Sequence, residues 1–230
     1  MNLSIVIPCF NEENFILETL LNVKKNISEK DEVIIVNDAS TDYSKNKIEK
    51  FIENEKNFYL INHEKNYGKG ACLISAFKKV NNDIIIIQDA DLEYNPNEYK
   101  KLINPINNNS ADVVFGSRFI GSDAHRVFYF YNRIANMILT FLTNIICNIN
   151  LTDMETGFKA FKKSSLNQII LNQKGFGIEP ELTIKFAKKK LKIFEVGISY
   201  SGRSYEEGKK IGMLDFFIAI YCIIKYRVTD

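Results

Sequence analysis

The sequence predicts an α/β fold built on a mostly parallel, doubly wound sheet with helices on both faces. Over residues 1–117, short apolar runs alternate with longer amphipathic segments, which is the pattern of successive strand–helix–strand units. Residues 84–87 are four isoleucines, and such a continuous apolar run indicates a strand buried on both faces. Polar segments follow the first four predicted strands, at the edge where open α/β sheets bind ligands.

The elements of the first half are expected in regular alternation. Residues 3–8 form an apolar run that Pro8 closes, which predicts the first strand. Asn11 is a suitable N-cap for a helix that continues to about residue 25. We expect the remaining strands at residues 32–36, 58–62, 84–87 and 112–115, and the intervening helices to end at residue 52 and to span residues 71–80 and 96–107.

The second half has a different rhythm. Residues 127–149 and 213–227 are apolar, aromatic-rich stretches of helical character. Between them we expect strands at 156–161 and 192–200 and a helix at 179–190. Without an internal repeat or linker, the chain is predicted to be one domain, residues 1–230, with an apolar helical C-terminal elaboration.

Composition excludes several classes of protein. The 230 residues are 46% hydrophobic, which suffices for a large core. The four cysteines are scattered without a CxxC pair, so neither a zinc site nor a disulfide framework is expected, and reduced cytosolic thiols are the default. A net charge of +2 argues against nucleic-acid binding. No signal peptide and no apolar run of about 18 residues is visible.

Charge is nevertheless divided unevenly along the chain. Residues 1–117 carry 13 basic and 18 acidic side chains, whereas residues 118–230 carry 17 and 10. The basic half could meet phosphates or an anionic membrane surface, although solvated helix faces account for many of its lysines.

An acidic pair follows the isoleucine run at the expected binding edge. Asp89 and Asp91 are two positions apart, and their mutual repulsion is unfavourable unless a cation or several donors lie between them. A divalent metal holding a diphosphate would satisfy both carboxylates. A strand-ending Asx turn is the alternative interpretation.

Several motifs together resemble the family 2 glycosyltransferases, which have the GT-A fold, and especially the dolichyl- or polyprenyl-phosphate sugar synthases. The resemblance covers nearly the whole chain. Its motifs are Val6-Ile7-Pro8-Cys9-Phe10-Asn11-Glu12, Val36-Asn37-Asp38-Ala39-Ser40-Thr41-Asp42, Asn66-Tyr67-Gly68-Lys69-Gly70, Asp89-Ala90-Asp91-Leu92-Glu93, Gly116-Ser117-Arg118-Phe119, Thr156-Gly157-Phe158-Lys159 and Gly197-Ile198-Ser199-Tyr200-Ser201-Gly202-Arg203. Each is weak alone, but their order and spacing are specific.

The resemblance implies roles for residues on the donor side. Pro8, Glu12 and Asp38 would line the pocket for base and ribose, although Glu12 could be a helix-start charge and Asp38 a helix cap. Asp89 and Asp91, with Ala90 between them, would contact the donor, and the two aspartates, joined by Glu93, would hold Mg²⁺ or Mn²⁺. Lys69 is either a phosphate ligand or a solvated loop charge.

Basic and acidic residues downstream carry the expectations for the acceptor. Arg118, Arg133, Lys174 and Arg203 are the candidates for donor and acceptor phosphates, because arginine grips phosphate oxygens with a planar fork. The loop 202–210 could close over the donor. Asp153, with Glu155 second, is the candidate base if the acceptor is a hydroxyl, or else holds the acceptor loop. Glu179 is a candidate wall of the site, and Glu181 a helix-start charge.

The resemblance therefore implies an inverting hexosyltransferase. Asp91, Asp153 and Arg118 are its candidate catalytic residues. The donor would be a GDP- or UDP-linked sugar, bound by residues 1–117, and the favoured acceptor a polyprenyl phosphate, bound by residues 118–230. Transfer to a sugar or glycolipid hydroxyl, and a non-catalytic nucleotide-sugar-binding subunit, are the alternatives. The two apolar helical stretches could be core or could lie in a membrane interface, which places the expected protein in the cytoplasm, peripheral at a membrane or on a membrane-protein partner.

Overall fold

The computed structural model describes residues 1–121, 126–127, 129–203 and 212–229. In this part of the chain seven strands form one sheet in the order β3-β2-β1-β4-β6-β5-β7. The strands are β1 (Leu3–Cys9), β2 (Glu32–Asn37), β3 (Phe58–Asn62), β4 (Ile84–Ile87), β5 (Val113–Ser117), β6 (Lys159–Lys162) and β7 (Ile193–Gly197). All neighbours are parallel except where β6 pairs with β4 and β5, which confirms the predicted mostly parallel sheet.

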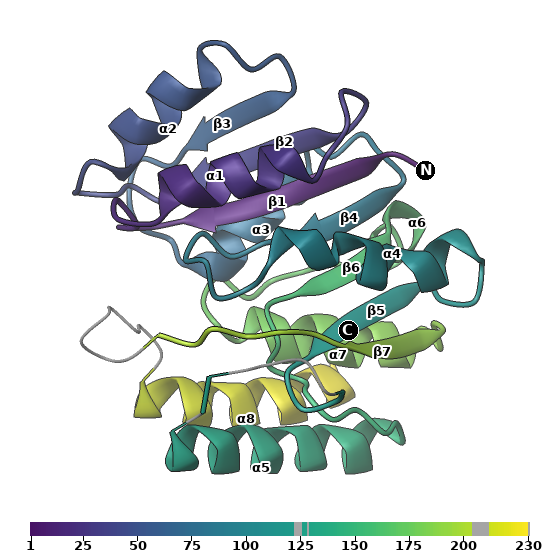
Figure 1. Cartoon of the computed structure of the whole chain (residues 1–230). Helices are drawn as coiled ribbons and strands as arrows, with labels where there is room; N and C mark the ends of the chain where they lie inside the picture. Colours follow the sequence, from purple (N-terminus) through teal and green to yellow (C-terminus); the bar gives the residue numbers. More distant parts are fainter. Residues whose placement is uncertain (122–125, 128, 204–211, 230) are drawn as a thin grey trace.

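The helices cover both faces of this sheet. They are α1 (Ile16–Lys25), α2 (Ser44–Ile52), α3 (Lys69–Phe77), α4 (Tyr99–Asn107), α5 (Phe130–Cys147), α6 (Lys163–Leu166), α7 (Ile178–Lys188) and α8 (Met213–Val228), with a 3₁₀ turn η1 (Pro96–Glu98) before α4. One buried cluster joins α1, α2 and α4 to the sheet, and a second joins α3 and α7 to it. The doubly wound arrangement is visible in Figure 1.

The isoleucine strand lies at the centre of this arrangement. All four residues of β4 are fully buried, between β1 on one side and β6 on the other. A strand buried on both faces has no solvated positions, which explains why its sequence does not alternate. The strand therefore delivers Asp89 and Asp91 from a rigid core.

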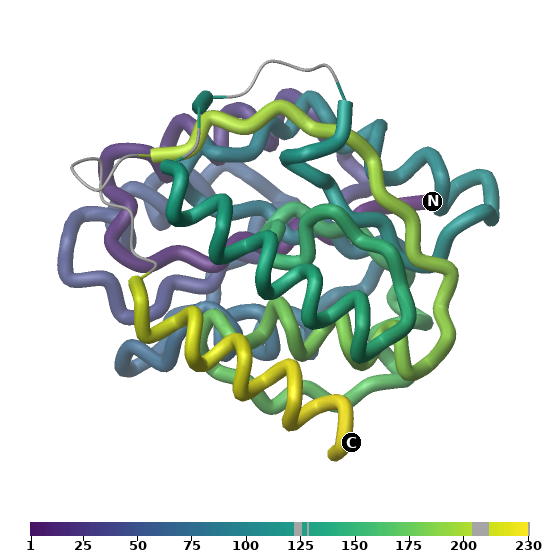
Figure 2. Tube along the Cα trace, turned by 90° about the horizontal axis from the view of Figure 1, so that it is seen from below, coloured from purple at the N-terminus to yellow at the C-terminus, as the bar shows by residue number. Residues whose placement is uncertain are grey.

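A third layer lies outside the two faces of the sheet. Helices α5 and α8 pack against each other and against α7, and Figure 2 shows them side by side on the underside of the molecule. In Figure 1 the N-terminal ends of α5 and α8 lie on the same side as the carboxyl end of β1. Among the described residues, none of the helices combines the length and apolarity needed to cross a bilayer.

Two local predictions were wrong. Helix α1 begins at Ile16 and not near Asn11, which adopts a φ of 50°. Its side-chain oxygen accepts a hydrogen bond from the Thr41 amide at 2.8 Å, so Asn11 joins two loops instead of capping the helix. The strand expected at 156–161 is shifted: β6 begins at Lys159. Just before it, the Gly157 amide donates to the Tyr94 hydroxyl instead of to a neighbouring strand.

Candidate functional site

A cavity of about 410 Å³ opens at the carboxyl edge of the parallel strands. Its walls combine the end of β1, the segment after β4, the loop before α3 and the segments after β5 and β7. Ten residues predicted to contact donor or metal line it: Pro8, Glu12, Asp38, Lys69, Asp89, Ala90, Asp91, Glu93, Arg118 and Arg203. The sheet topology thus brings motifs from distant parts of the sequence to one place.

Arg203 joins three carboxylates on one wall. Its guanidinium donates to Glu12 Oε2 at 2.9 Å and to Asp91 Oδ2 at 2.7 Å. Its backbone amide donates to Glu93 Oε1 at 2.8 Å. Tyr200 donates its hydroxyl to the other oxygen of Glu93 at 2.6 Å. Arg203 therefore balances part of a concentrated negative charge. The predicted closing loop, 202–210, lies outside the described residues from 204 onward.

A second chain of charges begins at Asp89 and continues through Lys69 and Glu179 to Lys159. Lys69 Nζ is 2.8 Å from Asp89 Oδ1 and 3.2 Å from Glu179 Oε1. The buried Lys159 pairs with the other oxygen of Glu179 and with the carbonyl of Thr156. The carboxylates of Asp89 and Glu179 raise the pKa of the Lys69 ammonium against the effect of its burial, so Lys69 stays charged. Lys69 is consequently part of the site and not a solvated loop charge.

Negative charge at this edge is in excess. Burial, followed by the neighbouring carboxylates of Glu93 and Asp89, raises the pKa of Asp91 to about 7, although Arg203 opposes the shift. An all-carboxylate donor set with unbalanced charge fits a hard divalent cation such as Mg²⁺ or Mn²⁺. In the structure Asp89 and Asp91 face Lys69 and Arg203, so basic side chains stand beside the predicted metal ligands.

Asp38 lines the cavity and holds the loop that contains Gly68 and Gly70. Its carboxylate accepts hydrogen bonds from the amides of Tyr67 and Gly68 and lies 2.6 Å from His63 Nδ1. Asp38, His63 and Cys72 place ligand atoms within 4.8 Å of one another, but both ring nitrogens of His63 already have partners. Asp38 does not cap α2 but fixes the cavity wall.

The two loop glycines are required by packing against the chain itself. Gly68 has a φ of 97°, and a Cβ there would lie 2.6 Å from the carbonyl oxygen of Lys174. At Gly70 a Cβ would lie 2.1 Å from the carbonyl oxygen of Gln173. Their lack of side chains therefore lets the loop dock on the 173–175 segment.

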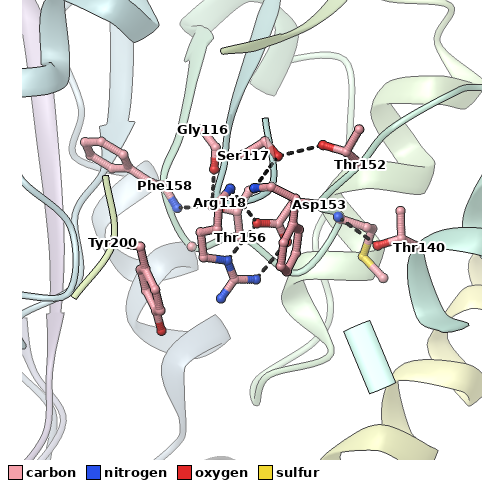
Figure 3. A network of polar contacts seen from close by, with 12 residues as sticks. Gly116, Ser117, Arg118, Thr140, Thr152, Asp153, Thr156, Phe158 and Tyr200 are labelled. Carbon is pink, nitrogen blue, oxygen red and sulfur yellow. Dashed lines mark hydrogen bonds and ion pairs between the residues drawn. The ribbon is translucent and has the colours of Figure 1, made fainter. Parts of the chain in front are cut away.

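Arg118 and Asp153 form a buried bidentate pair beside the cavity (Figure 3). The Nε and Nη2 atoms of Arg118 each donate to Asp153 at 2.7 Å, and its backbone amide donates to Asp153 Oδ2 at 3.0 Å. The Asp153 side chain is fully buried, whereas Arg118 lines the cavity and lies over the ring of Tyr200. Both oxygens of Asp153 are thus engaged with Arg118, which fits its predicted loop-holding role better than the role of a base.

Comparison with known proteins agrees with this geometry. The family profile described as glycosyl transferase family 2 matches residues 4–170. The chain belongs to that family. Within it, the transferase is 29% identical to the UDP-N-acetylglucosamine–dolichyl-phosphate N-acetylglucosaminyltransferase of Methanococcus voltae, over 97% of this chain and 95% of the relative.

Two further relatives carry lipid-phosphate names. The dolichol-phosphate mannosyltransferase of Pyrococcus furiosus is 27% identical, over 99% of this chain and 65% of the relative. The undecaprenyl-phosphate mannosyltransferase of Micrococcus luteus is 25% identical, over 92% of this chain and 88% of the relative. The predicted resemblance to this group of transferases is confirmed.

Solved structures confirm the GT-A fold. Glucosyl-3-phosphoglycerate synthase from Mycobacterium tuberculosis, crystallised with Mn²⁺, UDP and glucosyl-3-phosphoglycerate, has a TM-score of 0.76 at 18% identity and covers 100% of this chain and 81% of its own. The same enzyme crystallised with Mg²⁺ and UDP has a TM-score of 0.74 at 18% identity, covering 100% of this chain and 80% of its own. At these identities the likeness concerns the fold.

Three predicted residues of the transferase do not line the cavity. Asp153 is buried behind Arg118. Arg133 is exposed on the first turn of α5, with its guanidinium 5.7 Å from the ring centre of Phe119. Lys174 is exposed beside Tyr67. These three side chains therefore do not share the cavity with Asp89 and Asp91. The sequence could not show this, because the order of residues along the chain does not say which side chains face the cavity.

The cavity is also lined by residues to which the sequence analysis gave no role. Tyr94, Gly157, Phe176 and Tyr200 line the cavity. Tyr94 is stacked on Phe158 and accepts a hydrogen bond from the Gly157 amide at 3.0 Å. Gly157 and Tyr200 belong to two of the motifs that resemble the family, so the sequence did contain a signal that they lie at the site. Glu179, predicted as a wall, does line the cavity.

Proposed function

We propose that this transferase moves a hexose from a GDP- or UDP-linked sugar to a polyprenyl phosphate, with inversion at the anomeric carbon. The observation that carries the proposal is a single cavity lined both by the carboxylates of Asp89, Asp91 and Glu93 and by the guanidinium-bearing side chain of Arg118. Such a site can receive a metal-bound diphosphate on one side and an anionic acceptor on the other. The names of the three relatives support a lipid-phosphate acceptor.

The two halves of the chain divide this work in the proposal. Residues 1–117 supply Pro8, Glu12 and Asp38 for the nucleoside and Asp89 and Asp91 for the metal-bound diphosphate. Residues 118–230 supply Arg118 for an acceptor phosphate. Arg203 reaches across to the donor side, where it contacts Glu12 and Asp91.

The protein's own groups act by positioning and charge. Bound Mg²⁺ or Mn²⁺ would supply neutralisation of the charge that develops on the departing nucleoside diphosphate. Asp89, Asp91 and Glu93 are the residues that would hold it. A phosphate acceptor is already a nucleophile at neutral pH, so it needs no proton-abstracting residue. This agrees with Asp153 being engaged on both oxygens by Arg118.

A transfer assay tests the proposal directly. The protein is incubated with Mn²⁺, a short polyprenyl phosphate in detergent and UDP-glucose, UDP-N-acetylglucosamine or GDP-mannose in turn. We expect one of these donors to give a β-linked polyprenyl phosphohexose, detected by mass spectrometry and NMR. Matched reactions with the free polyprenol should give no product. Product on polyprenol or a glycolipid hydroxyl, with none on the phosphate, would overturn the choice of acceptor.

The outer layer of the molecule supports attachment to a lipid surface. On α5 the exposed residues Phe130, Met137, Phe141 and Ile145 follow helical spacing, with exposed fractions from 53% to 70%. On α8 the matching stripe is Leu214, Phe217, Ile218, Tyr221, Ile224 and Val228. The opposite sides of both helices are packed together around Leu139, Ala219 and Ile223. Two adjacent helices thus present apolar stripes outward, an arrangement that suits a membrane interface.

Basic residues flank these stripes. Arg133 is exposed near the start of α5, and Arg227 is exposed near the end of α8. Because anionic lipid headgroups attract such side chains, we place the α5–α8 face at the membrane. Figure 1 shows the beginnings of α5 and α8 on the same side of the molecule as the carboxyl end of β1. Pro8 and Cys9 at that end of β1 line the cavity, so this orientation would bring a lipid-bound phosphate toward the site.

The double variant Phe141→Glu/Phe217→Glu should lose binding to anionic vesicles. Each large apolar side chain contributes about 1.5–3 kcal/mol when buried, so the partition coefficient should fall on the order of 100-fold or more. Co-sedimentation with phosphatidylglycerol-containing vesicles measures it. Tyr43→Glu/Tyr59→Glu is the matched control, since these aromatics are 71% and 51% exposed outside α5 and α8. Unchanged vesicle binding, or dissociation of a soluble dimer instead, would contradict the assignment.

A further inference from the structure

Among the described residues that line the cavity, Glu155 is a carboxyl without an ion pair, whereas its charged neighbours are paired. Arg118 pairs with Asp153, Lys69 with Asp89, and Lys159 with Glu179. Glu155 lines the same cavity, and its buried Oε1 atom has no hydrogen-bond partner among the residues that the structure describes. A buried polar atom without a partner is costly to a folded protein. It therefore marks a place where a ligand can complete the hydrogen bonding.

The surroundings of Glu155 define which ligand that can be. Burial and the carboxylate of Glu179 on α7 raise the pKa of Glu155 to about 7, while Lys159 on β6 and Arg118 after β5 act in the opposite direction and Asp153 adds to the increase. A phosphate group placed here would meet further negative charge. A hydroxyl group, by contrast, can donate to the unpartnered oxygen without adding charge. The ring of a hexose offers several such hydroxyls.

The chain segment that carries Glu155 runs between Arg118 and the predicted metal ligand Asp89. The segment begins at Asp153, the partner of Arg118, and ends at Gly157 beside the acidic edge. A Cβ at Gly157 would lie 2.4 Å from Asp89 Oδ2 and 3.0 Å from Lys69 Nζ. Gly157 thus lies against Asp89 and Lys69, and Glu155 is two positions before it in the same segment. The sugar of a bound nucleotide sugar adjoins the diphosphate, so it would lie near this segment.

We propose that Glu155 binds the transferred hexose, accepting a hydrogen bond from one of its ring hydroxyls, and thereby determines which sugar the enzyme accepts. This inference rests on the proposed function, because it requires a nucleotide sugar in the cavity. It assigns Glu155 to recognition of the sugar, not to removal of a proton from the acceptor.

Binding measurements with Glu155→Ala and Glu155→Gln test the assignment. Titration calorimetry with Mn²⁺ compares the nucleoside diphosphate with the nucleotide sugar that the transfer assay identifies. In both variants the affinity for the nucleoside diphosphate should change less than about twofold. In Glu155→Ala the affinity for the nucleotide sugar should fall about 10–100-fold, as expected for the loss of a hydrogen bond to a charged group. Glu155→Gln retains an acceptor oxygen and should lose less. Glu53→Ala, on the exposed end of α2, is the matched control.

Deoxy-sugar donors locate the contact. For the wild-type protein, removing one particular ring hydroxyl of the donor should weaken binding about as much as the Glu155→Ala substitution does. The Glu155→Ala protein should bind that deoxy donor no more weakly than it binds the complete donor. Equal losses in both proteins at every ring position would overturn the inference. So would a Glu155→Gln variant that binds the nucleotide sugar normally but turns over about 100-fold or more slowly, since that pattern defines a general base.

The failures of the two proposals are distinguishable. If wild type binds none of the nucleoside diphosphates with Mn²⁺, the proposed function itself fails. If it binds them and transfers sugar while Glu155 variants bind the donor normally, only the sugar-recognition inference fails.

A pH readout on the free protein adds a check that does not need substrate. Because the folded state holds the Glu155 proton more tightly than the unfolded state, wild type should lose stability relative to Glu155→Gln as pH rises from about 4.5 to about 7. Above that range the difference should remain constant. A pH-independent difference in urea midpoints would show that Glu155 is not held in the unpartnered, buried state from which its role is argued.

Discussion

The variant Asp153→Asn is expected to lower the free energy of unfolding by about 3–5 kcal/mol, because it removes one partner of a buried ion pair. Asparagine keeps the size of the side chain but leaves the Arg118 guanidinium, 13% exposed, without a counter-charge. It also replaces one of the two oxygens that accept bonds of 2.7 Å from Arg118. Urea unfolding followed by circular dichroism measures the loss.

An exposed ion pair provides the matched control. Lys45 and Glu49 lie one turn apart on α2, and both side chains are 47% exposed. Glu49→Gln should therefore cost no more than about 0.5 kcal/mol. Both Asp153→Asn and Glu49→Gln remove one negative charge from an ion pair. The difference between their losses in free energy of unfolding therefore measures the effect of burial.

A second variant separates stability from catalysis. Arg118→Met/Asp153→Leu replaces the pair with apolar side chains of similar length, and much of the lost stability should return, while transfer should not. If the Asp153→Asn protein has the same urea midpoint as wild type but no longer transfers sugar, the role of Asp153 in positioning Arg118 would be contradicted. That result would return Asp153 to its other predicted role, a base acting on a hydroxyl acceptor.

The parts of the fold that depend on local patterns were predictable from the sequence. The sequences of β1, β2 and β4 are largely apolar because β2 and β4 are buried throughout and β1 is buried except at Pro8, and the order of these strands along the chain predicts parallel crossovers. The carboxyl-edge rule then collected Glu12, Asp38, Asp89 and Asp91 into one cavity. Neither inference required knowledge of any contact between distant residues.

The parts that depend on long-range contacts were not predictable in this way. Asn11 has the composition of a helix cap, but the Thr41 amide, thirty residues away, is its partner. The alternation of strand and helix gave no sign that β6 would run antiparallel between β4 and β5. Which cation faces which carboxylate is decided by such placements, so the pairing of Arg203 with Asp91 could not be foreseen.

Helices α5 and α8 likewise combine a feature that the sequence predicts with one that depends on long-range packing. The apolar, aromatic composition of residues 127–149 and 213–227 is visible in the sequence. Whether such a residue is core or surface depends on how the two helices pack, and in the structure each helix does both. Leu139 and Ile223 are buried in their contact, whereas Phe141 and Ile224 face outward. Amphipathic reasoning fails here because both faces of each helix are apolar.

The second large effect is expected at the acidic edge, where Asp91→Asn should reduce the rate of transfer on the order of 10²–10³-fold, the usual cost of losing one group that stabilises developing charge. Burial, and after it the neighbouring carboxylates of Glu93 and Asp89, raises the pKa of Asp91, so its carboxylate lies among other negative charges. Such crowding is unfavourable in the free protein and becomes favourable when a divalent cation binds. Initial rates with Mn²⁺, and Mn²⁺ binding followed by electron paramagnetic resonance, measure both consequences.

Asp83→Asn is the matched control for this exchange. Asp83 is exposed immediately before β4, so the two aspartates stand at opposite ends of the same buried strand. Asp83→Asn should leave rate and Mn²⁺ binding unchanged, and the Asp91→Asn protein should remain folded because Arg203 keeps its bond to Glu12. Undiminished transfer by Asp91→Asn, or by wild type in excess EDTA, would rule out a metal held at this edge. Lost transfer with Mn²⁺ binding intact would instead mean that Asp91 acts on the donor itself, leaving Asp89 and Glu93 to hold the ion.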